Sequence, residues 1–264
     1  MYDLKHTLFT IISFVALTIA LIICKIYIKD QKKKDIVLKV AIILTLIIHY
    51  SPLYVDFFAT GRAEIHHSMI LSVYPCNLAM WLLLYVAFAK NKQSKIFKTL
   101  AIITFYLGSL GGIIGIVFNL NYAYNPNLLD WHILNGLLSH VTLMFGCIYI
   151  LVGGYIKIRV SNIFAMLIGE AIMIVNGYSI IFLFDIFNVP PVNCMFLLYP
   201  PIESAPWLNA YLIGLFSTII LFVFTVIYEQ IAVKRGERWY NKLKEWNTQR
   251  KSIKNQNNNM ETKN

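Results

Sequence analysis

Seven long apolar runs divide this chain, and they constrain its fold more than any other feature. A helix needs about 20 apolar residues to cross the roughly 30 Å hydrocarbon core of a bilayer. Runs of that length lie at residues 7–28, 36–55, 69–89, 98–119, 131–152, 162–186 and 206–231. We therefore predict an all-α, polytopic membrane protein, a bundle of seven transmembrane helices.

The composition leaves no material for a soluble catalytic domain. Of the 264 residues, 58% are hydrophobic and 14% are charged, whereas a soluble domain of this size needs a charged surface. We expect two parts: a transmembrane domain over residues 1–233 and a basic, partly disordered cytoplasmic tail over residues 234–264. In that tail, Trp239 and Trp246 among lysines and arginines indicate a helix at the membrane interface.

The basic residues are sorted between alternate connections. Those on one side are Lys25, Lys29, Lys32, Lys33, Lys34, Lys39, Lys90, Lys92, Lys95, Lys98, Lys157, Arg159 and those from Lys234 onward, which leaves Lys5 and Arg62 on the other. Cytoplasmic connections carry such an excess, so we predict an outside N-terminus and a cytoplasmic C-terminus. The same placement accounts for the net charge of +10, and we predict no nucleic-acid partner.

Polar side chains inside the spans point to a site in the outer half of the bilayer. Counted from the outer ends, four spans place them in one layer: His49 in the second, Cys76 and Asn77 in the third, His140 in the fifth and Asn176 in the sixth. Polar groups are costly at this depth and mark function in membrane proteins. We therefore treat this layer as the candidate site.

Cys76 is the natural nucleophile of this layer, because a thiol reacts once a neighbouring base removes its proton. Either His140 or His49 is placed to be that base. Pro75 removes one helical hydrogen bond and loosens the turn beside the thiol. The alternative is structural: a small cysteine that packs between helices and histidines that hydrogen-bond across them.

Other motifs are weaker. Gly108, Gly111, Gly112 and Gly115 form small-xxx-small pairs, which indicate close helix packing rather than a phosphate loop. Glu64, His66, His67 and His132 match no metal-ligand spacing, so we predict neither a metal nor a cofactor. A disulfide between Cys76 and Cys194 would remove the nucleophile. Glu170, in the inner half of the sixth span, is either paired locally with Lys157 or Asn162 or part of a proton path.

Three segments carry a resemblance to a known family. They are MILSVYPCNLAMWLLLYVA from Met69, LNGLLSH ending at His140, and NCMFLLYPP followed by APWLNAY. Together they resemble the YwaF-like integral membrane proteins, a family that includes the vertebrate transmembrane protein 164, described as a phospholipid acyltransferase. The resemblance implies that Cys76 and His140 are the functional pair and that Asn193 occupies the position of a family asparagine.

The resemblance implies acyl transfer through a thioester on Cys76, with membrane phospholipids as partners and with Asn77 or Asn193 donating to the oxyanion. The excess of Lys over Arg and the abundance of Ile and Asn indicate a bacterial protein, so we predict a multi-pass protein of a bacterial cytoplasmic membrane, whose outer side lacks acyl-CoA. The alternative function is a small-solute transporter or receptor with an outward-facing polar pocket. A scaffold without chemistry is the third.

Overall fold

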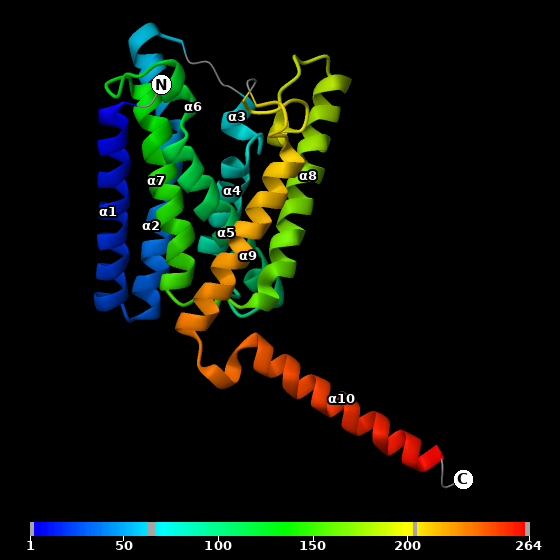
Figure 1. Ribbon diagram of the computed structural model, residues 1–264. Coiled ribbons are helices and arrows are strands. Elements are labelled where there is room, and N and C mark those ends of the chain that lie inside the picture. The colour runs from blue at the N-terminus through cyan, green and yellow to red at the C-terminus, as the bar shows by residue number, and fades with distance from the viewer. Residues whose placement is uncertain (1–2, 63–66, 203–204, 262–264) are drawn as a thin grey trace.

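The computed structural model describes residues 3–62, 67–202 and 205–261, except the side chains of His67, Ser68 and residues 251–261. Within these ranges the chain is all-α, and six helices are long and apolar enough to cross a membrane. They are α1 (Leu4–Tyr27), α2 (Gln31–Thr60), α5 (Lys95–Val117) continued by α6 (Leu120–Tyr124), α7 (Trp131–Val152), α8 (Ile163–Ile186) and α9 (Ala210–Ala232). They stand side by side in a bundle (Figure 1).

The predicted third span is the exception. Residues 69–89 were expected to form one continuous helix, but the structure has a single turn, α3 (His67–Ile70), and a 14-residue apolar helix, α4 (Pro75–Phe88). At ~1.5 Å per residue α4 is about 21 Å long, too short to cross a bilayer alone. Among the described residues there are thus six long helices and one broken segment, and a seventh crossing by that segment stays a prediction.

The broken segment nevertheless joins the two ends of the bundle. At one level the Tyr50 hydroxyl of α2 donates to the carbonyl of Met69, 2.8 Å away. About fifteen residues nearer the start of α2, Asp35 pairs with Lys92, in the connection between α4 and α5. The α3–α4 segment therefore extends from one level of α2 to the other.

The basic connections gather at one end of the molecule. Lys92 pairs there with Asp35, and Arg159, in the connection after α7, pairs with Glu237 of the short turn η3 (Arg235–Glu237). This placement confirms that the basic residues lie together at one end. Which compartment that end faces stays a prediction.

The tail leaves the bundle at the same end and forms a single helix, α10 (Trp239–Glu261) (Figure 1). A buried carboxylate fixes its start: Glu229, in the last turn of α9, accepts hydrogen bonds from the backbone N–H groups of Val160 and Trp239 at 2.6 Å each. The tail therefore begins from a fixed point, and the partial disorder expected of its end stays a prediction.

Candidate active site

The first turn of α4 carries the candidate nucleophile. Proline restricts the residue before it to extended backbone, and Tyr74 has φ −117° and ψ 158°. Pro75 then occupies the first helical position, where its missing N–H costs nothing. Cys76, expected beside a loosened turn in the outer half of a continuous span, thus lies in the first turn of a new helix, where backbone N–H groups have no acceptor within the helix.

The extended stretch before α4 is held by polar groups from α8 and from the loop that follows it. The side-chain amide of Asn176 on α8 donates to the carbonyl of Ser72 at 2.8 Å. The backbone N–H of Met195, in the short turn η2 (Cys194–Phe196), donates to the carbonyl of Val73 at 2.8 Å. Because non-helical backbone at membrane depth must find partners within the protein, these bonds make the break before Cys76 possible.

His140, on α7, lies against Cys76, and their side chains are within hydrogen-bonding reach. Its Nδ1 is 2.6 Å from the carbonyl oxygen of Gly136, one turn earlier. A carbonyl only accepts hydrogen bonds, so this contact places the proton on Nδ1 and leaves the Nε2 lone pair to accept a proton. The tautomer is the one that a base for the Cys76 thiol requires.

Glycines on α5 make the space for this pair. A Cβ atom at Gly115 would overlap the Cδ2 and Nε2 atoms of His140, whereas one at Gly111 would sit at ordinary contact, 4.0 Å, from the backbone of Cys76. Gly108 and Gly112 similarly face Cys147 and Met144 of α7. The glycine spacing therefore serves close helix packing, as predicted, and also gives the imidazole its room.

His49, on α2, is the third ionisable group of the site. It is close enough to His140 to interact with it electrostatically, and its Nε2 is buried without a hydrogen-bond partner among the described residues. Among the described residues, Cys76 has a side-chain hydrogen-bonding contact with His140 and none with His49. Of the two bases left open by the sequence, the geometry favours His140.

Asn135, which the sequence reasoning missed, holds α2 in place beside the pair. Pro52 lies inside α2 and has no N–H, so the carbonyl of Ile48 lacks its usual helical donor. The Asn135 side-chain amide donates to that carbonyl and, at 3.1 Å, to the Ser51 hydroxyl. A proline in one span and an asparagine in the LNGLLSH segment were the available signals, but only the fold shows that they meet.

The three asparagines predicted to belong to the site have different structural roles. The Asn77 side-chain oxygen accepts from the N–H of Tyr74 at 3.2 Å and so caps α4. Asn176 is bonded to Ser72, as described above. Asn193 donates to the carbonyl of Tyr199 at 2.8 Å and accepts from the N–H groups of Leu198 and Tyr199, so it organises the loop beyond the site.

The four cysteines are free thiols, and the predicted alternative of a bond between Cys76 and Cys194 is not formed. Cys194 packs against Val73 and Phe184, and burial raises its pKa to about 11. That thiol is poorly suited to act as a nucleophile near neutral pH.

The candidate metal ligands that the structure describes do not come together. Glu64 and His66 lie outside the described residues, as does the side chain of His67. His132 instead pairs with Asp56, with 3.1 Å between Nε2 and the carboxylate. Among the described residues, no three His, Cys, Asp or Glu side chains form a ligand group.

These features define the class: a multi-pass, α-helical membrane protein in which a thiol at a helix start faces an imidazole. The family comparison then gives the membership. The model of the TMEM164 family matches residues 1–228, and the chain belongs to that family, to which the YwaF-like proteins are related. No curated protein matched the chain, and no solved structure matched it either.

Proposed function

We propose that this protein is a phospholipid acyltransferase that works through a thioester on Cys76, with His140 as its base. The contact between these two side chains, with Nδ1 of His140 bound to the Gly136 carbonyl, carries the proposal. The alternative is a purely structural polar pair between helices. The tautomer set by the Gly136 carbonyl, which leaves Nε2 as the proton acceptor, is the feature that favours catalysis.

The first step forms the acyl-enzyme. His140 Nε2 takes the thiol proton, and the Cys76 sulfur attacks the ester carbonyl carbon of a donor phospholipid. As the tetrahedral intermediate collapses, the C–O bond breaks, and His140 returns the proton to the departing lysophospholipid oxygen. The second step is the same sequence in reverse, with the hydroxyl of an acceptor lipid attacking the thioester.

The developing oxyanion needs a donor that is fixed before the reaction begins. We assign this role to the backbone N–H of Cys76, since it belongs to the first turn of α4, where the helix dipole also favours negative charge. This assignment replaces the earlier candidates Asn77 and Asn193, whose side chains cap α4 and order the following loop. His49, with its buried Nε2, completes the polar wall beside the pair.

The test is the intact mass of the purified protein after incubation with a diacyl phospholipid. We expect an acyl adduct that hydroxylamine removes, present in the wild type and in Cys194→Ser but absent in Cys76→Ala. His140→Gln should slow its formation by about two orders of magnitude. Cys194→Ser is the matched control, since Cys194 lies near the same break in the chain yet takes no part in the chemistry.

A wild-type protein that stays unacylated over many hours, while remaining folded, would overturn the proposal. The same polar layer would then be tested for a bound solute, as expected of a transporter or receptor.

A further inference from the structure

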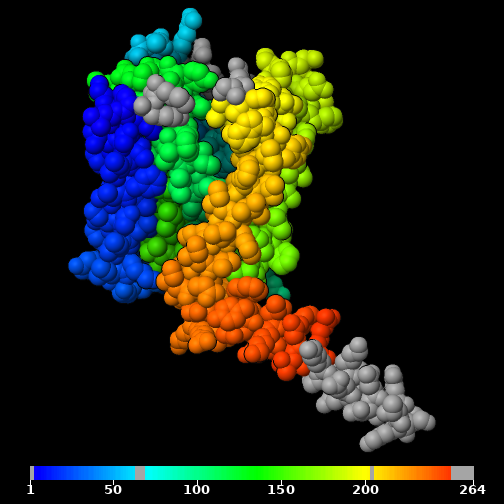
Figure 2. Space-filling model, in the orientation of Figure 1, coloured from blue at the N-terminus to red at the C-terminus, as the bar shows by residue number. Residues whose placement is uncertain are grey.

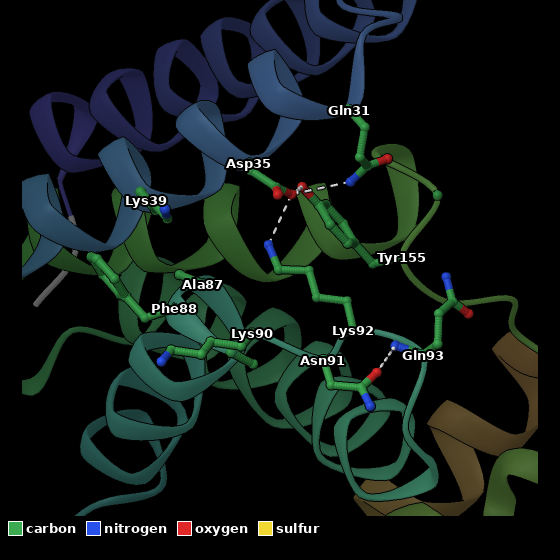
Figure 3. Close-up of a pocket in the computed structure, with 12 residues that line it drawn as sticks. Gln31, Asp35, Lys39, Ala87, Phe88, Lys90, Asn91, Lys92, Gln93 and Tyr155 are labelled. Atoms are coloured by element: carbon green, nitrogen blue, oxygen red, sulfur yellow. Dashed lines mark hydrogen bonds and ion pairs between the residues drawn. The ribbon is translucent and has the colours of Figure 1, made fainter.

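A second polar site lies at the other end of α4. It is a pocket of about 660 Å³ between the start of α2, the end of α4 with its connection to α5, and the turn after α7 (Figure 3). Its lining includes Asp35, Lys39, Phe88, Lys90, Lys92 and Tyr155. None of these residues takes part in the site around Cys76.

The charge in this pocket is unbalanced. Asp35 is its single carboxylate, and it already accepts from Lys92 at 2.8 Å, Tyr155 at 2.5 Å and Gln31 at 3.0 Å. Burial and the contact with Asp35 raise the pKa of Tyr155, so its hydroxyl remains a donor there. Figure 3 shows Lys92 turned toward Asp35.

Two lysines therefore remain without a carboxylate among the described residues. Lys39 reaches from α2 over the Phe88 ring, with its Nζ 5.4 Å from the ring centroid, and Lys90 follows α4 directly. They come from different elements and line one cavity. Because both ammonium groups are unpaired, the pocket presents an excess of positive charge to whatever enters it.

The apolar part of the wall indicates what kind of anion fits. Phe88 is half exposed at the end of α4, and Lys39 lies near the start of the apolar stretch of α2, which begins at Ile36. The pocket therefore lies where the apolar body of the bundle meets its basic end. A free phosphate ion needs no apolar wall, whereas a lipid needs the cationic and the apolar surface side by side.

We propose that this pocket binds the phosphate head group of an anionic phospholipid, with Lys39 and Lys90 contacting the phosphate and the acyl chains passing Phe88. The Lys92–Asp35–Tyr155 cluster forms the fixed floor of the site. The proposal does not depend on acyl transfer at Cys76, and it would hold for a protein that catalyses nothing.

Native mass spectrometry of the full chain tests it, with the protein taken from mixed micelles containing phosphatidylglycerol and phosphatidylcholine in equal amounts. The wild type should retain phosphatidylglycerol. The variant Lys39→Gln/Lys90→Gln should retain at least about fivefold less, whereas Lys32→Gln/Lys33→Gln, with the same loss of charge outside the pocket, should behave as wild type. Lys39→Arg/Lys90→Arg should restore retention.

Two outcomes would overturn the inference. Equal losses in the two Lys→Gln variants would show general attraction to a basic surface instead of a site. If inorganic phosphate at millimolar concentration raised the melting temperature in a Lys39- and Lys90-dependent way, and phosphatidylglycerol did not, the ligand would be a soluble phosphate compound rather than a lipid.

Discussion

Two groups of helices in this molecule are held together in different ways. In α5 and α7, 56% of the apolar stretch is buried, whereas in α9 the figure is 6%, and α9 runs down the outside of the molecule in Figure 2. Glycines bring the first group together: Gly108, Gly112 and Gly115 of α5 face side chains of α7, and Gly146 of α7 faces Leu83 of α4.

In the outer group, α9 is attached to its neighbours by isolated polar pairs, whereas α8 also packs closely on α5, since a Cβ atom at Gly169 of α8 would lie 2.9 Å from the Ile103 side chain. Thr218 of α9 donates to Glu170 of α8 at 2.5 Å, and Thr225 of α9 shares a 2.7 Å hydrogen bond with Tyr106 of α5. Lipid tails are as apolar as the helices, so membrane helices associate through close packing or through hydrogen bonds. Here the closely packed group carries the reactive pair, and the outer group reaches it through Asn176 and the η2 turn.

Thiol reactivity should show the largest difference between the two groups. At pH 8 a thiol with a pKa of about 11 is about 0.1% thiolate, so we expect N-ethylmaleimide to modify Cys76 at least tenfold faster than Cys194. His140→Gln should slow Cys76 alone, and raising the pH toward 11 should accelerate Cys194. A peptide-resolved mass-spectrometric time course measures both. Equal rates would contradict the roles given to the two thiols.

Substitution of glycines should separate the two packing modes. Gly115→Ala forces the new methyl group into the His140 ring and should destabilise the fold by about 1–3 kcal/mol, with loss of acylation. Gly111→Ala, with its 4.0 Å clearance, and Gly214→Ala on α9, with no atom within 4 Å, are the controls and should unfold as wild type does. The measurement is the unfolding midpoint in detergent. A Gly115→Ala variant as stable and active as its controls would refute the close packing.

The hydrogen bond from Asn135 to the Ile48 carbonyl can be removed by one substitution and compensated by a second. Asn135→Ala removes one of two side-chain donors to the Ile48 carbonyl, the other being the Ser51 hydroxyl at 2.7 Å, and should cost about 1 kcal/mol. Pro52→Ala restores an N–H one turn after Ile48, so it should recover part of this loss when combined with Asn135→Ala. Both single variants and the double variant are compared by chemical denaturation. Strict additivity would show that the two residues do not share this carbonyl.

The smallest effect is expected in the outer group. Thr218→Val removes the hydrogen bond to Glu170 with little change in volume, and polar contacts between membrane helices average about 0.6 kcal/mol. A loss near that value, without a change in the acylation rate, would confirm that this pair serves attachment only. A loss of acylation with unchanged stability would instead connect Glu170 to the chemistry.

The sequence alone determined the class of fold, because membrane crossing requires long apolar helices and sorted basic loops wherever the chain folds. Six of the seven spans predicted from the sequence are long helices in the structure, with ends close to the predicted residues. It also singled out Cys76, with His140 or His49 as its base, since polar groups are rare at that depth, and the structure places His140 in contact with it.

Only the tertiary structure decided how those residues are used. The start of α4 at Pro75 depends on Ser72 and Val73 finding partners on α8 and in the η2 turn, more than 100 residues away. Glu170 likewise finds Thr218 of α9, where the sequence offered Lys157 or Asn162. Periodicity and hydropathy describe one helix at a time, whereas the choice among hydrogen-bond partners belongs to the packed bundle.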